Sequence, residues 1–189
     1  KKTIVFVTHD MEEAIKLSDK ICIIKDGEIV QYDTPENLLK NPINEFVDEF
    51  VGRNNIWKAP ELIGAEDIMM ENPVTTRPNT KIYKCFDKMK SRRVDSLIVV
   101  DRNRNYLGVL KFSSLPEHGD MSVEVSSVMD VNIPVASPND NILDILEVVN
   151  GSNLSSIPVL DDGKLLGIIT RTTLLVTLSH QYMDTKEAF

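Results

Sequence analysis

The sequence predicts a mixed α/β protein made of two copies of one unit behind a separate amino-terminal segment. An internal repeat is the first observation: a shift of about 60 residues places 97–101 on 157–161 and, after a one-residue deletion, 108–110 on 167–169. In each copy, moreover, an amphipathic helical pattern precedes short β-branched runs. Residues 1–52 match neither copy, which makes them a separate segment.

The amino-terminal segment opens with the patterns of a strand and a helix. Residues 4–7 are continuously apolar, as a buried strand would be. Asp10 is followed three residues later by Glu13, which is the spacing of a capping box at a helix start. We therefore expect a strand over 4–7 and a helix from Asp10 to about Leu17.

A hairpin and two further helices complete this segment. The runs 21–24 and 28–32 flank a Lys-Asp-Gly turn, which favours a tight hairpin. A Thr-Pro pair at 34–35 opens a helix, because Pro is common at the first helical position. Apolar spacing over 43–50 predicts another helix that ends at Gly52.

Each copy of the repeat is expected to contain one amphipathic helix at the same place. Apolar residues recur at spacings of three and four over 82–90 and again over 142–149. Thr80 is the N-cap candidate of the first helix, and residues 139–141 supply Asn and Asp candidates for the second.

Strands follow both helices. Residues 97–100 and 157–160 are short, continuously apolar and rich in β-branched side chains, as strands buried on both faces should be. Turn residues at 101–105 and 161–163 come next, and the second of these ends in an Asp-Gly pair. We expect each turn to lead into a second strand and then a helix.

Composition and charge argue against several classes of function. With 42% apolar and 26% charged residues the chain resembles a globular protein, and its net charge of −8 argues against binding to nucleic-acid phosphates. No apolar run approaches the roughly 20 residues that cross a bilayer. Cys22 and Cys85 lie apart, without a CxxC pair or a histidine cluster, so no metal site or disulfide is expected, and a cytosolic compartment fits.

Charge is distributed unevenly between the two copies. Residues 65–118 contain ten basic and seven acidic side chains, whereas 119–178 contain two basic and eight acidic ones. This asymmetry indicates either an anionic ligand near the first copy or two solvated faces whose charges help copies or protomers to associate.

The segment around His9 resembles the carboxyl end of an ABC ATPase domain: a strand, Thr8-His9-Asp10, a helix with Glu-Ala, then a hairpin with Asp-Gly. The resemblance implies that His9 is the switch-loop histidine that contacts the γ-phosphate of ATP, a catalytic residue only in a full-length ATPase. The sequence has no G-x-x-x-x-G-K-[ST] loop, no signature motif and no apolar run ending in Asp-Glu. We therefore expect no enzyme activity from this chain. We expect ATP and magnesium to bind only in a longer parent protein.

The repeated units resemble CBS domains, which fold as a three-stranded sheet with two helices and bind adenosyl ligands in clefts between paired copies. The resemblance rests on Ile-Met at 68–69, Pro-Val-Leu-Asp at 158–161 and Gly-Ile-Ile-Thr-Arg at 167–171. The predicted parts are an ATPase fragment at 1–52, a linker at 53–64, CBS copies at 65–118 and 119–178, and a tail at 179–189.

The resemblance also places a ligand site where strand ends and helix starts of the CBS fold converge. Under the repeat, Val94 and Ser96 overlay residue 154 and Ser156, which yields two equivalent surfaces with apolar and hydroxyl groups. Such surfaces suit a purine held between aliphatic groups, and Arg171 can supply a forked donor for a phosphate. The predicted ligand-binding residues are Val74, Val94, Ser96, Ser156, Ile169, Thr170 and Arg171.

One departure from the family pattern bears on the ligand. CBS domains that hold AMP or ATP commonly place an Asp where this sequence has Ser114 and Thr173, and that carboxylate accepts hydrogen bonds from the ribose hydroxyls. Without it, a ligand with esterified sugar oxygens, such as a cyclic dinucleotide, is favoured over a free ribose diol.

An ABC ATPase end followed by a CBS pair resembles the ATP-binding subunits of bacterial glycine betaine, carnitine and choline importers. The resemblance implies a regulatory module that binds cyclic di-AMP between the CBS pairs of a homodimer and inhibits osmolyte uptake. It also implies transmembrane permease partners and a peripheral position at the cytoplasmic face of the membrane.

Two alternatives stay open. In one, the CBS pair only dimerises and binds no nucleotide. In the other, its charged surfaces sense ionic strength, so salt alone would change association.

Overall fold

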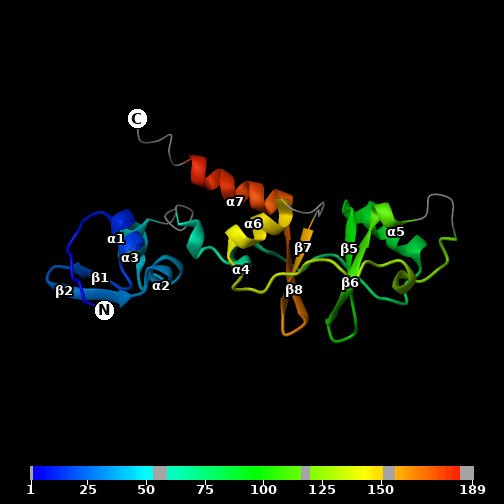
Figure 1. Cartoon of the computed structure of the whole chain (residues 1–189), viewed down its shortest axis with the longest axis horizontal. Coiled ribbons are helices and arrows are strands. Elements are labelled where there is room, and N and C mark those ends of the chain that lie inside the picture. The colour runs from blue at the N-terminus through cyan, green and yellow to red at the C-terminus, as the bar shows by residue number, and fades with distance from the viewer. Residues whose placement is uncertain (1, 53–58, 116–119, 151–155, 184–189) are drawn as a thin grey trace. The chain divides into compact units, whose positions relative to one another are not determined.

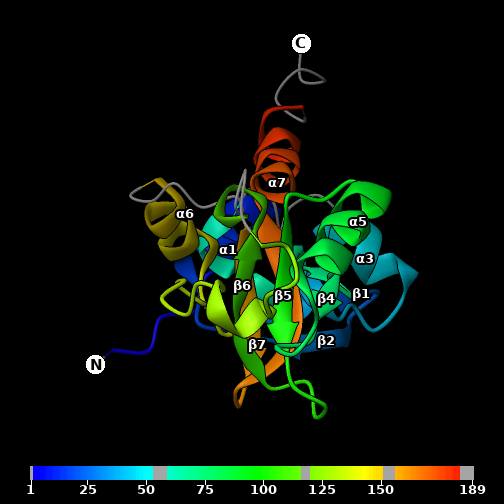
Figure 2. The ribbon, with the colours of Figure 1, turned by 90° about the vertical axis from the view of Figure 1, so that its right-hand side faces the viewer.

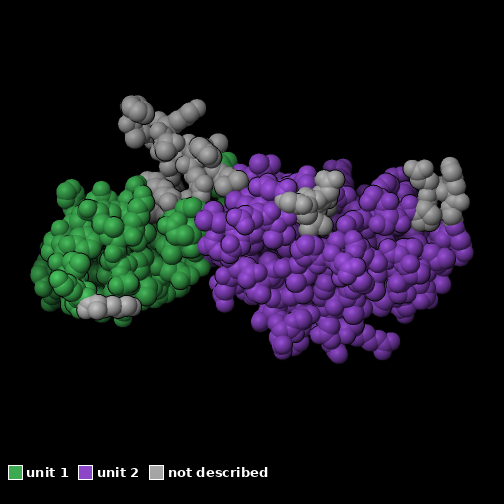
Figure 3. All heavy atoms as spheres, viewed as in Figure 1, with its two compact units in different colours: residues 1–63, 176–189 green, residues 64–175 purple. Residues whose placement is uncertain are grey.

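A computed structural model describes residues 2–52, 59–115, 120–150 and 156–183 of the protein (Figure 1). The chain forms two compact units, one of residues 1–63 with 176–189 and one of residues 64–175 (Figure 3). Each unit is taken by itself below.

The first unit begins with α1 (Met11–Leu17), as the capping pattern predicts. The Asp10 carboxylate accepts hydrogen bonds from the backbone N–H groups of Glu12 and Glu13, at 2.9 and 3.1 Å. Thr8 links the two residues of the predicted capping box: its hydroxyl accepts a hydrogen bond from the Asp10 N–H and donates one to the Glu13 carboxylate. Unpaired N–H groups at a helix start are thereby satisfied.

The predicted hairpin and helices of this unit are confirmed. The turn residues Asp26 and Gly27 have φ of 54° and 84°, the conformation that a two-residue hairpin turn requires. The core combines buried residues such as Ile23, Leu38 and Val47 from three of these elements. The elements are β1 (Ile21–Lys25), β2 (Glu28–Asp33), α2 (Pro35–Lys40) and α3 (Glu45–Val51).

The strand expected at 4–7 is wrong. These residues have no strand geometry, and Ile4, Val5 and Val7 are 80%, 88% and 95% exposed. A strand is stable only when a neighbour pairs its N–H and C=O groups. In the described part of this unit the only sheet is the β1–β2 ribbon, and it does not pair with 4–7.

Part of the predicted linker is structured. Residues 53–58 lie outside the described residues, but Pro60–Leu62 forms a 3₁₀ turn, and Ala59 and Ile63 on either side of it are 2% and 0% exposed. The end of this segment is therefore packed against the protein rather than extended in solvent.

The second unit contains both copies of the repeat. In the first copy, β4 (Thr75–Thr76) pairs in parallel with β5 (Ser96–Val100), which pairs in antiparallel with β6 (Tyr106–Lys111). The helix α5 (Ile82–Arg92) buries Ile82, Cys85 and Met89 against this sheet. Lys81, not Thr80, is the N-cap residue of α5, and it makes no side-chain capping bond.

The second copy repeats this arrangement. The hairpin β7 (Ser156–Asp161) and β8 (Lys164–Thr170) is antiparallel, and α6 (Ile142–Asn150) precedes it. Asn141, within the predicted capping stretch, accepts a hydrogen bond from the Leu143 N–H at 2.8 Å. After β8 the chain continues as α7 (Arg171–Met183). In the first copy the described residues after β6 form a 3₁₀ turn at Phe112–Ser114.

The two copies exchange their opening segments. The helix α4 (Ala65–Ile68) and strand β3 (Met70–Glu71) start the first copy, yet β3 pairs with β8 of the second. Reciprocally, Val125 and Met129 from the start of the second copy pack in the core of the first, and Asp130 exchanges backbone hydrogen bonds with Val109 at 2.8 and 2.9 Å. Neither copy is therefore a closed unit alone.

The hairpins of the two copies also meet near their turns, which lie at the same end of this unit (Figure 1, Figure 2). The Tyr106 N–H donates to the Gly163 carbonyl at 2.9 Å, and the Leu165 N–H donates to the Arg104 carbonyl at 3.1 Å. The Arg104 guanidinium donates a hydrogen bond to the Leu165 carbonyl at 3.2 Å.

Across the residues that the structure describes, no helix is long and apolar enough to span a membrane.

Candidate functional site

The two serines that sequence analysis singled out occupy equivalent places in the two sheets. Ser96 is the first residue of β5 and lies opposite Lys111, the last residue of β6. Ser156 is the first residue of β7 and lies opposite Thr170, the last residue of β8. Each hydroxyl thus stands at the sheet end where a helix or 3₁₀ turn begins.

In the first copy, Val74 and Val94 share one apolar core, and Ser96 follows Val94 by two residues at the start of β5. Val74 and Val94 are half-buried and pack on the same apolar core, and the Val74 carbonyl accepts from the Ile98 N–H at 3.1 Å. The Ser96 hydroxyl donates to the Asp95 carboxylate at 3.1 Å. That these residues form a ligand site stays a prediction.

Lys111 adds a cation near Ser96. Its ammonium lies 3.1 Å from the Asp130 carboxylate and hydrogen-bonds to it. The pKa of Asp130 is held below its ordinary value, first by the backbone N–H of Asn132 and then by this contact with Lys111. The repeat places Thr170 at the equivalent position of the second copy, so the two sheet ends differ in charge.

In the second copy, Ser156, Ile169 and Thr170 are neighbours across the β7–β8 ladder. Ser156 is 9% exposed and Ile169 is 1% exposed, so the Ile169 side chain belongs to the core. Arg171 follows as the first residue of α7 and is exposed. Residues 154 and 155, which precede Ser156, lie outside the described residues.

Thr173, one of the two positions where the family resemblance led us to expect an Asp, caps α7. Its hydroxyl accepts from the Thr170 N–H at 2.8 Å, and the Thr170 hydroxyl accepts from the Thr173 N–H at 3.1 Å. This reciprocal pair is a capping box. The Thr173 hydroxyl is thus already used by the helix start.

His9 lies in the first unit, exposed and just before α1. It thus belongs to a different unit from the other predicted site residues. The other predicted site residues fall into two groups, one at the sheet end of each copy.

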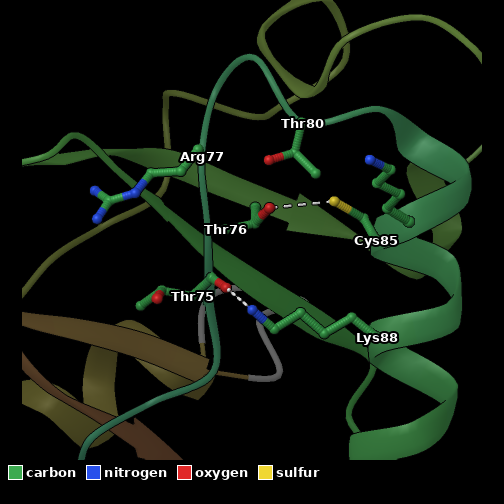
Figure 4. Close-up of a pocket in the computed structure, with 7 residues that line it drawn as sticks. Thr75, Thr76, Arg77, Thr80, Cys85 and Lys88 are labelled. Atoms are coloured by element: carbon green, nitrogen blue, oxygen red, sulfur yellow. Dashed lines mark hydrogen bonds between the residues drawn. The ribbon is translucent and has the colours of Figure 1, made fainter.

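A pocket that sequence analysis did not find lies between β4 and α5 of the first copy (Figure 4). It encloses about 220 Å³. On its floor the Thr76 hydroxyl and the Cys85 thiol are 3.2 Å apart, and at its side the Lys88 ammonium donates to the Thr75 carbonyl at 2.7 Å. Its lining residues are Thr75, Thr76, Arg77, Thr80, Lys84, Cys85 and Lys88. The signal that could have found it is the pair of lysines four residues apart on α5, one turn of a helix.

Comparison with known families gives a match to the CBS domain over residues 65–115 and 125–180. The chain is 38% identical over 176 residues to the carnitine transport ATP-binding protein OpuCA of Listeria monocytogenes. It is also 38% identical over 176 residues to the glycine betaine/carnitine/choline transport ATP-binding protein OpuCA of Bacillus subtilis. These alignments cover 92% of this chain but only 44% and 46% of the two relatives, so the chain spans less than half of their length.

Solved structures share the fold of the second unit. The crystal structure of CBSX2 in complex with AMP superposes with a TM-score of 0.57 at 21% identity, over 65% of this chain and 98% of that one. The CBS domain pair of protein MJ0100, in complex with 5′-methylthioadenosine and S-adenosyl-L-methionine, superposes with a TM-score of 0.56 at 18% identity, over 62% and 96%. These likenesses concern the fold.

Proposed function

The chain belongs to the CBS domain family, and we propose that it is the nucleotide-sensing regulatory part of the ATPase subunit of an osmolyte importer. Two lines of support meet here. The relatives that align over 92% of the chain are ATP-binding proteins of carnitine, betaine and choline transport. CBS pairs of the same fold are known in complex with AMP and with adenosyl compounds.

The observation that carries the proposal is the matched pair of strand ends at Ser96 and Ser156. Each serine opens its strand opposite the last residue of the return strand, and we propose that Val74 and Val94 supply aliphatic walls in the first copy. A purine can lie between such walls while polar groups read its edge. Arg171, exposed at the start of α7, would bind a phosphate through its planar fork.

Cyclic di-AMP is the ligand that we propose. The Thr173 hydroxyl is engaged in capping α7, so the second copy offers no carboxylate at this position for a free ribose diol. Ser114, the equivalent residue of the first copy, is also uncharged. A ligand whose sugar oxygens are esterified does not need that acceptor. We further propose that one cyclic dinucleotide bridges the CBS pairs of two protomers and inhibits transport.

The remaining roles belong to the longer protein that this chain would be part of. There, permease subunits would be its partners at the cytoplasmic face of the membrane, and ATP with magnesium would bind a complete ATPase domain. His9 would act as the switch-loop residue in that domain. The osmolyte is one of the betaine, carnitine and choline class that the relatives' names record.

Calorimetric titration of the chain with cyclic di-AMP, AMP and ATP tests the proposal. We expect micromolar or tighter binding of cyclic di-AMP at one ligand per dimer, weakened about tenfold or more by Arg171→Ala or Ser96→Ala. The control is Arg102→Ala, which removes an exposed cation in the β5–β6 turn. Absence of heat with every nucleotide would overturn the sensor and favour a module that only dimerises or senses ionic strength.

A further inference from the structure

We propose that the pocket between β4 and α5 is a binding site for a phosphate group, separate from the strand-end site of the proposed function. The pocket lies on the first copy and is built from the strand β4, the turn that follows it and one face of α5 (Figure 4). Its ligand class follows from its lining, its size and the different residues at the equivalent positions of the second copy.

The lining supplies cations and hydroxyl donors but no carboxylate. Lys84 and Lys88 are exposed and one helical turn apart on α5, so both ammonium groups border the same space. Thr80 adds a hydroxyl group from the turn after β4, whereas Thr75 contributes its backbone and its side chain points away from α5 (Figure 4). A phosphate group accepts several hydrogen bonds at once, and bonds between charged partners are the stronger ones. Because no acidic residue lines the pocket, nothing in the lining repels an anion.

The existing contacts hold the pocket open without using up its donors. Lys88 donates one of its three protons to the Thr75 carbonyl, so two remain for a ligand. The Thr76–Cys85 contact closes the buried floor. Arg77 is not counted among the donors, because its guanidinium donates to the Val100 carbonyl at 3.2 Å and points away from α5 (Figure 4).

The second copy lacks the chemistry of this lining. It has a helix at the equivalent place, but an isolated bridge at Ala136 instead of a strand, and the repeat replaces Thr80, Lys84 and Lys88. The equivalent residues are Asp140, Asp144 and Val148. Hydroxyl and ammonium groups have become aliphatic and carboxylate groups, so an anion would be excluded there.

Size limits the ligand to a small group. The pocket holds about 220 Å³, below the roughly 300–1,000 Å³ that encloses drug-sized molecules. It has room for a phosphate with a few waters, each of which takes about 30 Å³ in the liquid. The part of a ligand that the pocket encloses is therefore a phosphate group and not a whole nucleotide, which distinguishes this site from the proposed nucleotide site.

Titration of the ¹⁵N-labelled chain with inorganic phosphate, against chloride at equal ionic strength, tests the site. We expect saturable shifts of the Thr75, Thr76 and Thr80 amides with a dissociation constant on the order of 1 mM. The Lys84→Ala/Lys88→Ala variant should bind at least about tenfold more weakly. Lys90→Ala/Arg92→Ala removes two exposed cations of the same helix outside the lining, and it should bind within about twofold of wild type.

Shifts that do not saturate, or equal weakening in both double variants, would overturn the proposal. A second arm distinguishes a free phosphate from a lipid headgroup: sedimentation with vesicles of phosphatidic acid or of phosphatidylcholine alone. If the chain sediments with phosphatidic acid vesicles only, and the Lys84→Ala/Lys88→Ala variant does not, the ligand is a lipid headgroup. If the chain binds inorganic phosphate saturably but does not sediment with either kind of vesicle, the ligand is a soluble phosphate. Binding of cyclic di-AMP should be the same in both double variants, so this test and that of the nucleotide sensor fail independently.

Discussion

Gly108 of β6 lies so close to Asp130 that a Cβ atom on it would be 2.7 Å from the Asp130 carbonyl oxygen. Asp130 belongs to the opening segment of the second copy, which pairs with β6 of the first. The repeat reproduces the contact: a Cβ on Gly167 would be 2.8 Å from the Met70 carbonyl oxygen. Both exchanged segments therefore approach a glycine in the other copy.

Gly108→Ala should destabilise the second unit by about 2–4 kcal/mol, because the methyl group meets backbone and because φ at Gly108 is +153°. Urea unfolding followed by circular dichroism measures this change. Gly163→Ala is the matched control: its φ is also positive, but nothing lies within 4 Å of its Cβ, so about 1–2 kcal/mol is expected. Equal losses in the two variants would contradict the steric explanation.

Tyr106→Phe should leave stability unchanged or raise it by up to about 1 kcal/mol. The Tyr106 hydroxyl is buried, and within the described part of the chain it has no hydrogen-bond partner. Removing an unsatisfied polar group is neutral or favourable. Tyr83→Phe, at a residue that is 46% exposed, should change nothing. Destabilisation by Tyr106→Phe would show that the hydroxyl has a partner in solution.

The same tyrosine predicts a slope of stability against pH. Burial, and then the charge of Asp130, raise the pKa of Tyr106 to about 12, above the ordinary value near 10. The folded protein thus holds this proton more tightly than the unfolded chain. The contribution of this protonated tyrosine to the free energy of unfolding is complete below pH 10 and is lost as the pH rises towards 12. The difference in unfolding free energy between wild type and Tyr106→Phe should follow this course, and a difference that is constant with pH would contradict it.

Thr173→Asp should raise the affinity for AMP about threefold to tenfold, because it restores a carboxylate for the ribose hydroxyls. An aspartate there can still accept from the Thr170 N–H and suits a helix start, so α7 should keep its cap. Calorimetry with AMP makes the measurement. Thr172→Asp adds the same charge at a neighbouring exposed residue and should have a smaller effect. Equal gains would indicate attraction by net charge alone.

Local patterns predicted most of the fold because the forces that they report act over a few residues. The turn at Asp26 and Gly27 and the cap at Asp10 needed no distant partner, and both are confirmed. The expected strand at 4–7 failed because a strand depends on a neighbour that pairs with it. Thr80 is not the N-cap residue, because α5 begins at Ile82 and the residue directly before it is Lys81.

The candidate site also has a part that the sequence predicted and a part that it did not. The repeat predicted that Ser96 and Ser156 would be equivalent, and strand pairing places both at sheet ends. The phosphate pocket escaped detection because β4 and Lys84 come together only when the helix packs on the sheet. The exchange of opening segments was also missed, since sequence similarity between copies does not state which copy a segment packs against.

Cys85 offers a direct measure of that packing. It is 0% exposed, whereas Cys22 is exposed, so a thiol reagent should label Cys22 rapidly and Cys85 only when the first copy opens. Labelling of intact protein followed by mass spectrometry should therefore show two phases. The Cys22→Ser variant should lose the fast phase and keep the slow one. Rapid labelling of both thiols would contradict the buried position of Cys85.

Val125→Ala should accelerate the slow phase, although residue 125 is 40 positions from Cys85 in the sequence. Val125 opens the second copy but is 0% exposed in the core that contains Cys85 and Met89. Removing two buried methyl groups costs about 1.5–3 kcal/mol, which would raise the open population, and with it the Cys85 labelling rate, roughly tenfold or more. Val131→Ala, at a residue that is 57% exposed, should leave the rate within about twofold. If both variants label at the wild-type rate, the segment at 125–130 does not stabilise the first copy, and the exchange of segments between the copies is wrong.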